Sequence, residues 1–149
     1  MTEAAFDQLL RRLAEAGVEF VLIGGLAVNA WGVVRGTKDV DIVVAPDMEN
    51  LKRVAAVAAA VDGHVQTGES FLNSQPSIAG QLASGEQVAI ETELGSLDIV
   101  QGLHARATET EVLGVRVAVC SVEDLKAMKQ AAGRTRDLAD LEDLDAAGS

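Results

Sequence analysis

EFVLIGGLAVNAWGVVRGTKDVDIVV, residues Glu19–Val44, contains an apolar run that stops at two glycines, a second apolar run, and then two aspartates. The first run, Glu19–Ile23, predicts a buried strand, and Leu26–Val34 predicts a short buried helix. Residues 35–37 (Arg-Gly-Thr) predict a loop, and Lys38–Val44 predicts a second strand. The stretch therefore predicts a strand–helix–strand unit whose second strand returns beside the first.

The two aspartates, Asp39 and Asp41, are two positions apart in the second strand. Because alternate side chains of a strand point to opposite faces, both carboxylates share one face, and Val40 and Ile42 fill the other. Two carboxylates this close repel each other, which raises one pKa unless a cation neutralises them. Mg²⁺ is such a cation, and it is usually held by one or two carboxylates plus substrate phosphates. Taken alone, an Asp-x-Asp pair is more often two exposed acids on a half-solvated strand.

Gly24 and Gly25 lie at the junction between the first strand and the helix. The start of a helix presents backbone N–H groups at its positive end, where phosphate groups bind. A glycine has no side chain, so a phosphate can approach its backbone closely. The alternative is a tight turn without a ligand. The segment from Gly25 to Asp39 has room for one helix and one loop, so the glycines and the aspartates are expected at the same end of the sheet.

A third acid, Asp98, lies in the strand-like sequence GSLDIV, with Leu97 and Ile99 expected on the opposite face. An acid between apolar neighbours is unusual unless it is paired or faces a site. With Asp39 and Asp41, it could hold two metal ions. It could also share one ion, or take a proton from an attacking hydroxyl group. Asp98 alone would be an ordinary acid of an edge strand.

The remaining pattern predicts a single domain over residues 1–149, of the α/β (or α+β) class. Further helices are expected over residues 3–16, 46–61 and 121–132, followed by a last helix that contains Leu138, Leu141 and Leu144. Residues 87–92 and 96–101 predict a hairpin, and residues 112–119 predict another strand or hairpin. The pattern over residues 64–85 supports no assignment.

Composition restricts the classes of function. The formal net charge of −11 argues against a surface for long nucleic acid, which needs many Lys and Arg residues. It leaves room for a phosphate ligand that arrives with a metal ion. The one cysteine, Cys120, is expected in the core, and a reducing cytoplasm fits this cysteine usage. We expect neither a signal peptide nor a membrane-spanning segment, and we expect His64 and His104 to be surface or satisfied histidines.

The segment IGGLAVNAWGVVRGTKDVDIVV resembles the signature of the nucleotidyltransferase superfamily with the polymerase-β-like fold. That signature is Gly-Gly or Gly-Ser, a spacer and Asp-x-Asp, with a later Asp in another strand. The segment VCSVEDLKAMKQAAGRTRDLADLEDL is similar to the C-terminal part of small bacterial members, among them AbiEii-type toxins of toxin–antitoxin systems and minimal nucleotidyltransferases. The resemblance implies a nucleotidyltransferase fold, with a central mixed sheet flanked by helices and with helices at the C-terminal end.

The resemblance also implies roles for individual residues. Gly24 and Gly25 match the phosphate-binding turn, although many members have Ser at the position of Gly25. Asp39, Asp41 and Asp98 match the ligands of Mg²⁺ (or Mn²⁺), and Asp98 matches the acid that shares a metal ion or activates the acceptor hydroxyl group.

Three more residues match the nucleotide-binding part of the pattern. Arg35 and Thr37 match an Arg-x-Thr that supports the loop or a phosphate, and Lys129 matches a lysine that could reach the triphosphate. A further polar set near the site is matched by Arg134, Asp137 and Asp140. The alternative for Lys129 and Arg134 is ordinary pairing with acids at helical spacing on the surface.

The function that the resemblance implies is Mg²⁺-dependent transfer of a nucleoside monophosphate from a nucleoside triphosphate to an acceptor hydroxyl or phosphate group. A toxin–antitoxin system is one context for this activity. The acceptor could be a small molecule, a protein or RNA, and a homodimer or a partner protein is compatible with the sequence. One alternative is a catalytically inactive partner or regulatory subunit with the same fold. Another is transfer onto a small drug of the aminoglycoside or lincosamide type. An acidic protein surface attracts a cationic acceptor of this kind.

Overall fold

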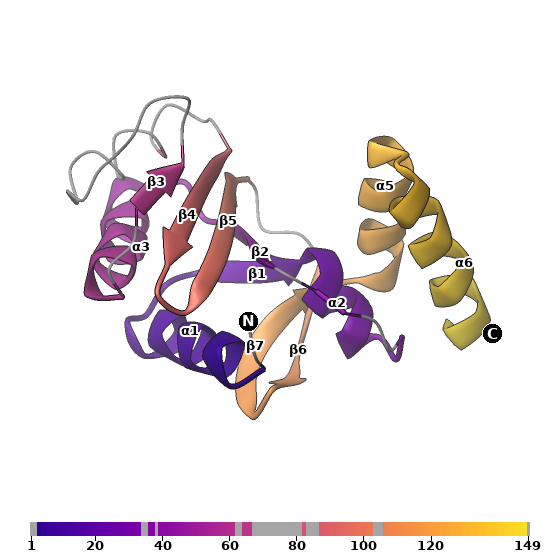
Figure 1. Cartoon of the computed structure of the whole chain (residues 1–149), viewed down its shortest axis with the longest axis horizontal. Coiled ribbons are helices and arrows are strands. Elements are labelled where there is room, and N and C mark those ends of the chain that lie inside the picture. The colour runs from indigo at the N-terminus through magenta and orange to yellow at the C-terminus, as the bar shows by residue number, and fades with distance from the viewer. Residues whose placement is uncertain are drawn as a thin grey trace.

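The computed structural model describes residues 3–33, 36–37, 39–61, 64–66, 82, 87–102 and 106–148. Seven strands of this part of the chain form one mixed sheet in the order β3-β4-β5-β2-β1-β7-β6 (Figure 1). The strands are β1 Phe20–Ile23, β2 Asp39–Val44, β3 His64–Gln66, β4 Val88–Thr92, β5 Gly95–Gln101, β6 Ala107–Val112 and β7 Val115–Cys120. The helices are α1 Glu3–Glu15, α2 Gly24–Ala30, α3 Met48–Ala60, α5 Val122–Ala132 and α6 Thr135–Gly148. The predicted α/β fold with a mixed sheet and C-terminal helices is confirmed.

The three central strands bring one row of residues together. β1 pairs with β2 in antiparallel fashion and sets Ile23 opposite Asp41. β2 pairs with β5 in parallel fashion and sets Asp41 opposite Asp98. Ile23 is directly followed by Gly24, where α2 begins. The start of α2, Asp41 and Asp98 therefore lie in one row across the sheet. The glycines and the aspartates are at the same end of the sheet, as expected from the length of the strand–helix–strand unit.

The alternation of side chains in β2 and β5 has the predicted form. Val40 and Ile42 of β2 are fully buried, as are Leu97 and Ile99 of β5. The residues between them, which include the aspartates, are partly exposed. Because a strand turns alternate residues to opposite faces, burial of the aliphatic residues forces the acids onto the opposite, more open face of the sheet.

Asn50 anchors α3 to the end of the antiparallel β1–β2 pair. Its side-chain oxygen accepts a hydrogen bond from the backbone N–H of Glu19 at 2.7 Å. Its amide nitrogen donates to the backbone oxygens of Glu19 at 3.0 Å and Ala45 at 2.9 Å. The helix itself is capped by the carboxylate of Asp47, which accepts from the N–H of Asn50. A buried amide with these partners fixes α3 against the sheet.

Helices α5 and α6 form a pair at the opposite end of the molecule from α1 and α3 (Figure 1). The predicted cap at Ser121 is present, since its side chain accepts from the N–H of Asp124. Gly133, in the left-handed conformation with φ of 64°, ends α5 and lets the chain turn into α6. Within the described residues, no helix combines the length and the apolar character that crossing a bilayer requires.

The predicted bounds of the helix after the first strand were wrong. The helix expected over Leu26–Val34 begins at Gly24 and ends at Ala30, because Trp31 and Gly32 leave the helical conformation and Gly32 has φ of 101°. The strand or hairpin expected over residues 112–119 is a hairpin, with its turn at Leu113 and Gly114, which have φ of 51° and 81°. Two consecutive positive φ angles match the right-handed twist of the flanking strands, so this short segment closes a hairpin.

Candidate active site

Three carboxylates gather at the row shared by β2 and β5. One oxygen each from Asp39, Asp41 and Asp98 lies within 4.8 Å of the others. All three side chains are half-buried. Strand alternation brings Asp39 and Asp41 to one face, and the parallel register sets Asp98 directly beside Asp41. This is a set of hard oxygen donors at the separation that a divalent cation can bridge.

Two of these carboxyl groups, Asp41 and Asp98, have raised pKa values. The pKa of Asp98 is raised to about 7, first by burial, and then by a hydrogen bond to Asp41 and by the charges of Asp41, Asp39 and Glu91. Burial is also the first cause of the raised pKa of Asp41. Lys129 and Arg136 act in the opposite direction on Asp41 through their positive charge. Near neutral pH the group therefore holds a proton or needs a cation in its place.

Gly24 lies against this acidic group. Its φ of 70° is in the left-handed region, and a β-carbon at this position would lie 2.8 Å from Cγ of Asp41. Glycine is required there both by the backbone conformation and by the space that Asp41 occupies. The N-cap of α2 is Ile23, whose side chain holds no hydrogen-bond acceptor, so the N–H groups of the first turn have no side-chain cap.

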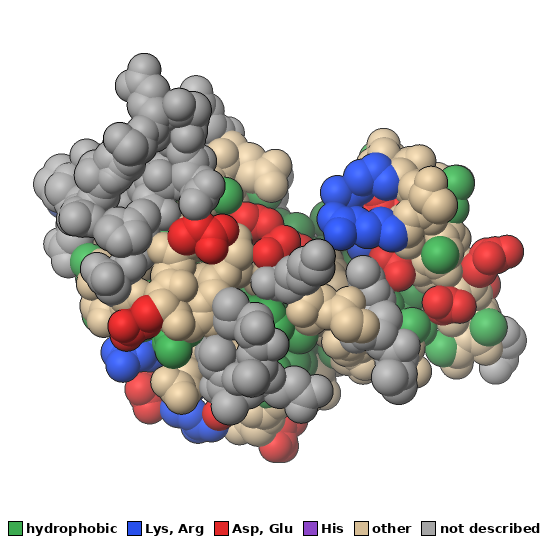
Figure 2. Space-filling model, viewed as in Figure 1, with side chains coloured by type: hydrophobic (Ala, Val, Ile, Leu, Met, Phe, Trp, Pro, Cys, Tyr) green, Lys and Arg blue, Asp and Glu red, His purple; other side chains and the backbone are tan. Residues whose placement is uncertain are grey.

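The acids and the start of α2 line one side of a cleft of about 570 Å³. Thr37 lies on its rim, and the Oγ1 hydroxyl donates to the backbone oxygen of Asp39 at 3.2 Å. The opposite side of the cleft is formed by α5, α6 and the turn between them. Its lining residues are Leu125, Met128, Lys129, Ala132, Arg134, Arg136 and Asp137. In Figure 2 the hollow is seen between acidic side chains over the sheet and a group of basic side chains over the α5–α6 pair.

The basic side of the cleft is built on a buried ionic cluster. Nζ of Lys129 lies 2.9 Å from Oδ2 of Asp140 and 3.3 Å from Oδ1 of Asp137. Nε of Arg134 lies 2.7 Å from Oδ2 of Asp137. The Arg134 guanidinium is the main cause that lowers the pKa of Asp137 to about 2. Lys129 is buried together with Asp137 and Asp140, so the alternative of ordinary surface pairing was wrong for Lys129. The exposed Arg134, by contrast, does pair with Asp137 at helical spacing.

Arg136 was not singled out by the sequence pattern. It lines the cleft and its positive charge acts on Asp41 from the first turn of α6. An Arg-x-Arg pair, Arg134 and Arg136, directly after the glycine that ends α5 was the signal that could have indicated it.

The remaining candidates from the sequence are Arg35, the two histidines and the cysteine. Arg35, His104 and the side chain of His64 lie outside the described residues. Cys120 is fully buried, and burial raises its pKa to about 11. Such a thiol is protonated at neutral pH, which agrees with the core assignment.

The chain matches the sequence model of one family, described as "Nucleotidyl transferase of unknown function (DUF2204)", over residues 2–147. No curated protein matches it in sequence. The match to the family extends over nearly the whole chain and includes every residue of the acidic group and of the basic side of the cleft.

Solved structures share the fold. The antibiotic-resistance factor ANT(2'')-Ia has a TM-score of 0.70 at 13% identity, over 99% of this chain and 84% of the other. The lincosamide antibiotic adenylyltransferase LnuA, solved with lincomycin bound, has a TM-score of 0.72 at 15% identity, over 97% of each chain. An antigenic nucleotidyltransferase-like protein from Paracoccidioides brasiliensis has a TM-score of 0.63 at 16% identity, over 97% of this chain and 74% of the other.

Proposed function

The chain belongs to the nucleotidyl transferase family, and from this premise we propose that it moves a nucleoside monophosphate from a nucleoside triphosphate to an acceptor hydroxyl or phosphate group. The observation that carries the proposal is the pairing, in one cleft, of three acids on the sheet with a basic side on α5 and α6. A divalent cation needs the three acids, and a polyphosphate group needs the basic side of the cleft.

The acidic group fits a divalent cation, Mg²⁺ or Mn²⁺. The pKa values of Asp41 and Asp98 are raised first by burial and also by neighbouring carboxylates, and the charge of a bound cation would offset both causes. Asp39, Asp41 and Asp98 would hold the ion. When bound, Mg²⁺ supplies charge neutralisation at the phosphates and lowers the pKa of an attacking hydroxyl group.

The protein's own groups would divide the remaining work. Gly24 and Gly25 would let phosphate approach the uncapped N–H groups at the start of α2, with Thr37 on the rim beside them. Asp98 would share the ion or, where Asp39 and Asp41 hold it alone, would accept the proton of the acceptor hydroxyl group. Lys129 would contribute positive charge, which already acts on Asp41.

We favour a small-molecule acceptor. Two of the similar structures are described as an antibiotic-resistance factor and a lincosamide adenylyltransferase, and the second matches this chain over nearly its whole length. The net charge of −11 suits a cationic acceptor better than RNA. The toxin–antitoxin context, and the AbiEii-like subgroup with it, rests on the resemblance of the C-terminal segment alone.

The acceptor can be found by incubating the protein and Mg²⁺ with each α-labelled nucleoside triphosphate, first with a cell extract and then with single aminoglycosides and lincosamides. The proposal expects label in a small molecule in one of these reactions. Label in RNA or protein would exclude the small-molecule acceptor while keeping the reaction class. An inactive partner or regulatory subunit would give no label, and calorimetry would detect no heat with millimolar nucleotide and Mg²⁺.

A further inference from the structure

The turn between α5 and α6 carries more ionic contacts than the capping of one helix requires. Both carboxylate oxygens of Asp137 are in use. Oδ2 accepts from the backbone N–H of Arg134 at 3.1 Å and from Nε at 2.7 Å, and Oδ1 accepts from Nη2 at 3.3 Å. Oδ1 also accepts from Nζ of Lys129 at 3.3 Å. Asp137 is thus the common partner of two cations that line the cleft.

The members of this cluster differ sharply in exposure. The side chain of Lys129 is 9% exposed and that of Asp137 is 0% exposed, whereas that of Arg134 is 59% exposed. A ligand in the cleft can therefore reach Arg134 much more readily than the other two. Asp137 holds Nε and Nη2 of Arg134 but does not use Nη1. The guanidinium group keeps donors for a second anion while one edge is fixed.

We propose that Asp137 is a positioning residue that fixes Arg134 on the wall of the cleft as a ligand of the triphosphate, with Lys129 holding Asp137 from within. This inference rests on the proposed function, because it takes the polyphosphate of a nucleoside triphosphate as the ligand. A two-point grip on a guanidinium group removes side-chain freedom during folding. Arg134 then binds phosphate without a further ordering cost.

Positioning and simple charge predict opposite results when Asp137 is neutralised. Removal of a negative charge makes this side of the cleft more positive and, by charge alone, strengthens the binding of an anion. Loss of the grip on Arg134 weakens binding, because the guanidinium group must then be ordered by the ligand. A merely structural role would lower thermal stability and leave the affinity of the folded protein unchanged.

The test is calorimetry of the full chain with inorganic tripolyphosphate in the presence of Mg²⁺. Arg134→Gln is expected to raise Kd about tenfold, the effect of losing a charge-assisted hydrogen bond. Asp137→Asn is expected to raise Kd severalfold. The double variant is expected to bind no more weakly than Arg134→Gln alone, because Asp137 acts through Arg134.

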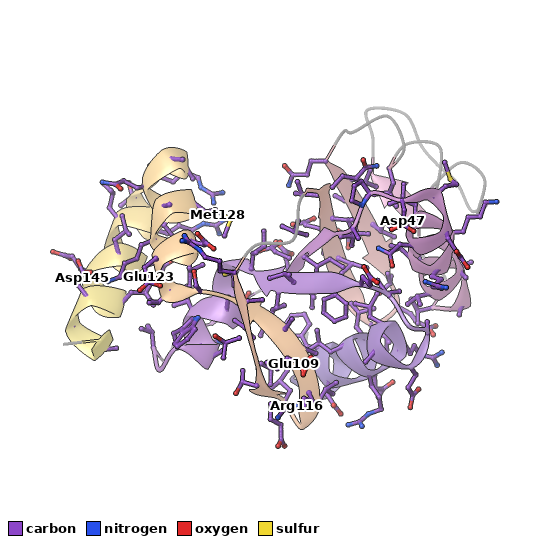
Figure 3. All side chains as sticks on the ribbon, turned by 180° about the vertical axis from the view of Figure 1, so that it is seen from behind. Asp47, Glu109, Arg116, Glu123, Met128 and Asp145 are labelled. Atoms are coloured by element: carbon purple, nitrogen blue, oxygen red, sulfur yellow. The ribbon has the colours of Figure 1, made fainter. Side chains whose placement is uncertain are left out.

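Two matched controls lie away from the cleft. Arg116, on β7, pairs with Glu109 at the far end of the β6–β7 hairpin, and Asp145, on α6, pairs with Lys126 (Figure 3). Arg116→Gln and Asp145→Asn remove the same kinds of charge and ion pair from exposed positions. Both are expected to leave Kd unchanged.

Arg134→Lys decides the matter even if Asp137→Asn fails to fold. Lysine keeps the charge but cannot make the two-point contact with Asp137, so the proposal expects Kd to rise as in Arg134→Gln. Wild-type affinity in Arg134→Lys, or unchanged or tighter binding by a folded Asp137→Asn, would overturn the positioning role. If the wild-type protein itself bound no tripolyphosphate, the proposed function would fail together with this inference.

Discussion

Gly24 lies so close to Asp41 that any side chain at position 24 would displace that carboxylate, since its β-carbon would lie 2.9 Å from Cβ of Asp41. The contact joins the start of α2 to the acidic group, so the proposed phosphate and metal sites depend on each other's geometry. A change in one is expected to disturb the other.

Gly24→Ala is therefore expected to lower both stability and metal binding. The left-handed backbone alone costs about 1 kcal/mol for alanine, and the clash with Asp41 adds to it. Gly17→Ala is the matched control, because Gly17 has φ of 77° and nothing within 4 Å of its added β-carbon. Denaturant unfolding with and without Mg²⁺ measures both effects. Equal losses in the two variants, with equal responses to Mg²⁺, would contradict the role of this contact.

Asp98→Asn is expected to stabilise the protein at neutral pH in the absence of divalent cations. The pKa of Asp98 is raised from 3.8 to about 7 in the folded state, so its bound proton favours folding at low pH. That contribution is lost as the pH rises from about 4 to 7 and stays lost above 7. The asparagine side chain at position 98 of the variant does not titrate, so the variant lacks this contribution at every pH.

The stability difference between Asp98→Asn and the wild type should therefore grow from pH 4 to pH 7 and then level off. We expect it to reach on the order of 1 kcal/mol, less than the full pKa shift implies, because solvent screens a half-buried group. Urea unfolding in EDTA at several pH values measures it. A difference that does not vary with pH would show that Asp98 is not protonated in the folded protein.

Mg²⁺ is expected to stabilise the wild-type protein by relieving the repulsion among Asp39, Asp41 and Asp98. At a concentration about 100-fold above Kd, a bound ion adds about 2.7 kcal/mol, which raises Tm by several degrees. The effect should be larger at pH 8 than at pH 6, because a proton on Asp98 competes with the ion. Thermal unfolding at constant ionic strength checks this, and Asp39→Asn should abolish most of the shift.

Asn50→Ala is expected to destabilise the fold without changing the chemistry of the site. It leaves part-buried backbone groups of Glu19 and Ala45 without Asn50 as their partner, at a cost of roughly 2 kcal/mol. Lys52→Ala, an exposed position of the same helix, is expected to stay within about 0.5 kcal/mol of the wild type. The two are compared by urea unfolding, and a loss in Asn50→Ala no larger than in Lys52→Ala would contradict the anchoring role.

The acidic side of the site could be predicted from the sequence because strand alternation is local and strict. Asp39 and Asp41 share a face whatever surrounds them, and the aliphatic neighbours of Asp98 fixed its face in the same way. The basic side was predicted less well. The partners of Lys129 and the place of Arg136 depend on how α6 turns back at Gly133, which no local period encodes.

Backbone conformations that most residues avoid explain why the helix start was misplaced and why the position of the β6–β7 turn was not predicted. Gly24 starts α2 with a positive φ, so a pattern of apolar residues placed the helix start too late. Leu113 adopts φ of 51° in the β6–β7 turn, a conformation that leucine rarely takes and that propensity does not indicate.

The central claim is nucleotidyl transfer that depends on the three acids, and the most direct measurement compares two positions of the label. The wild-type protein and Mg²⁺ are incubated with the acceptor found by the labelling experiment above. The nucleoside triphosphate is labelled at the α-phosphate in one reaction and at the γ-phosphate in the other. We predict that only the α-label reaches the acceptor, that pyrophosphate is released, and that Asp39→Ala lowers the rate at least about 100-fold. Transfer of the γ-label, or an undiminished rate in Asp39→Ala, would contradict the account.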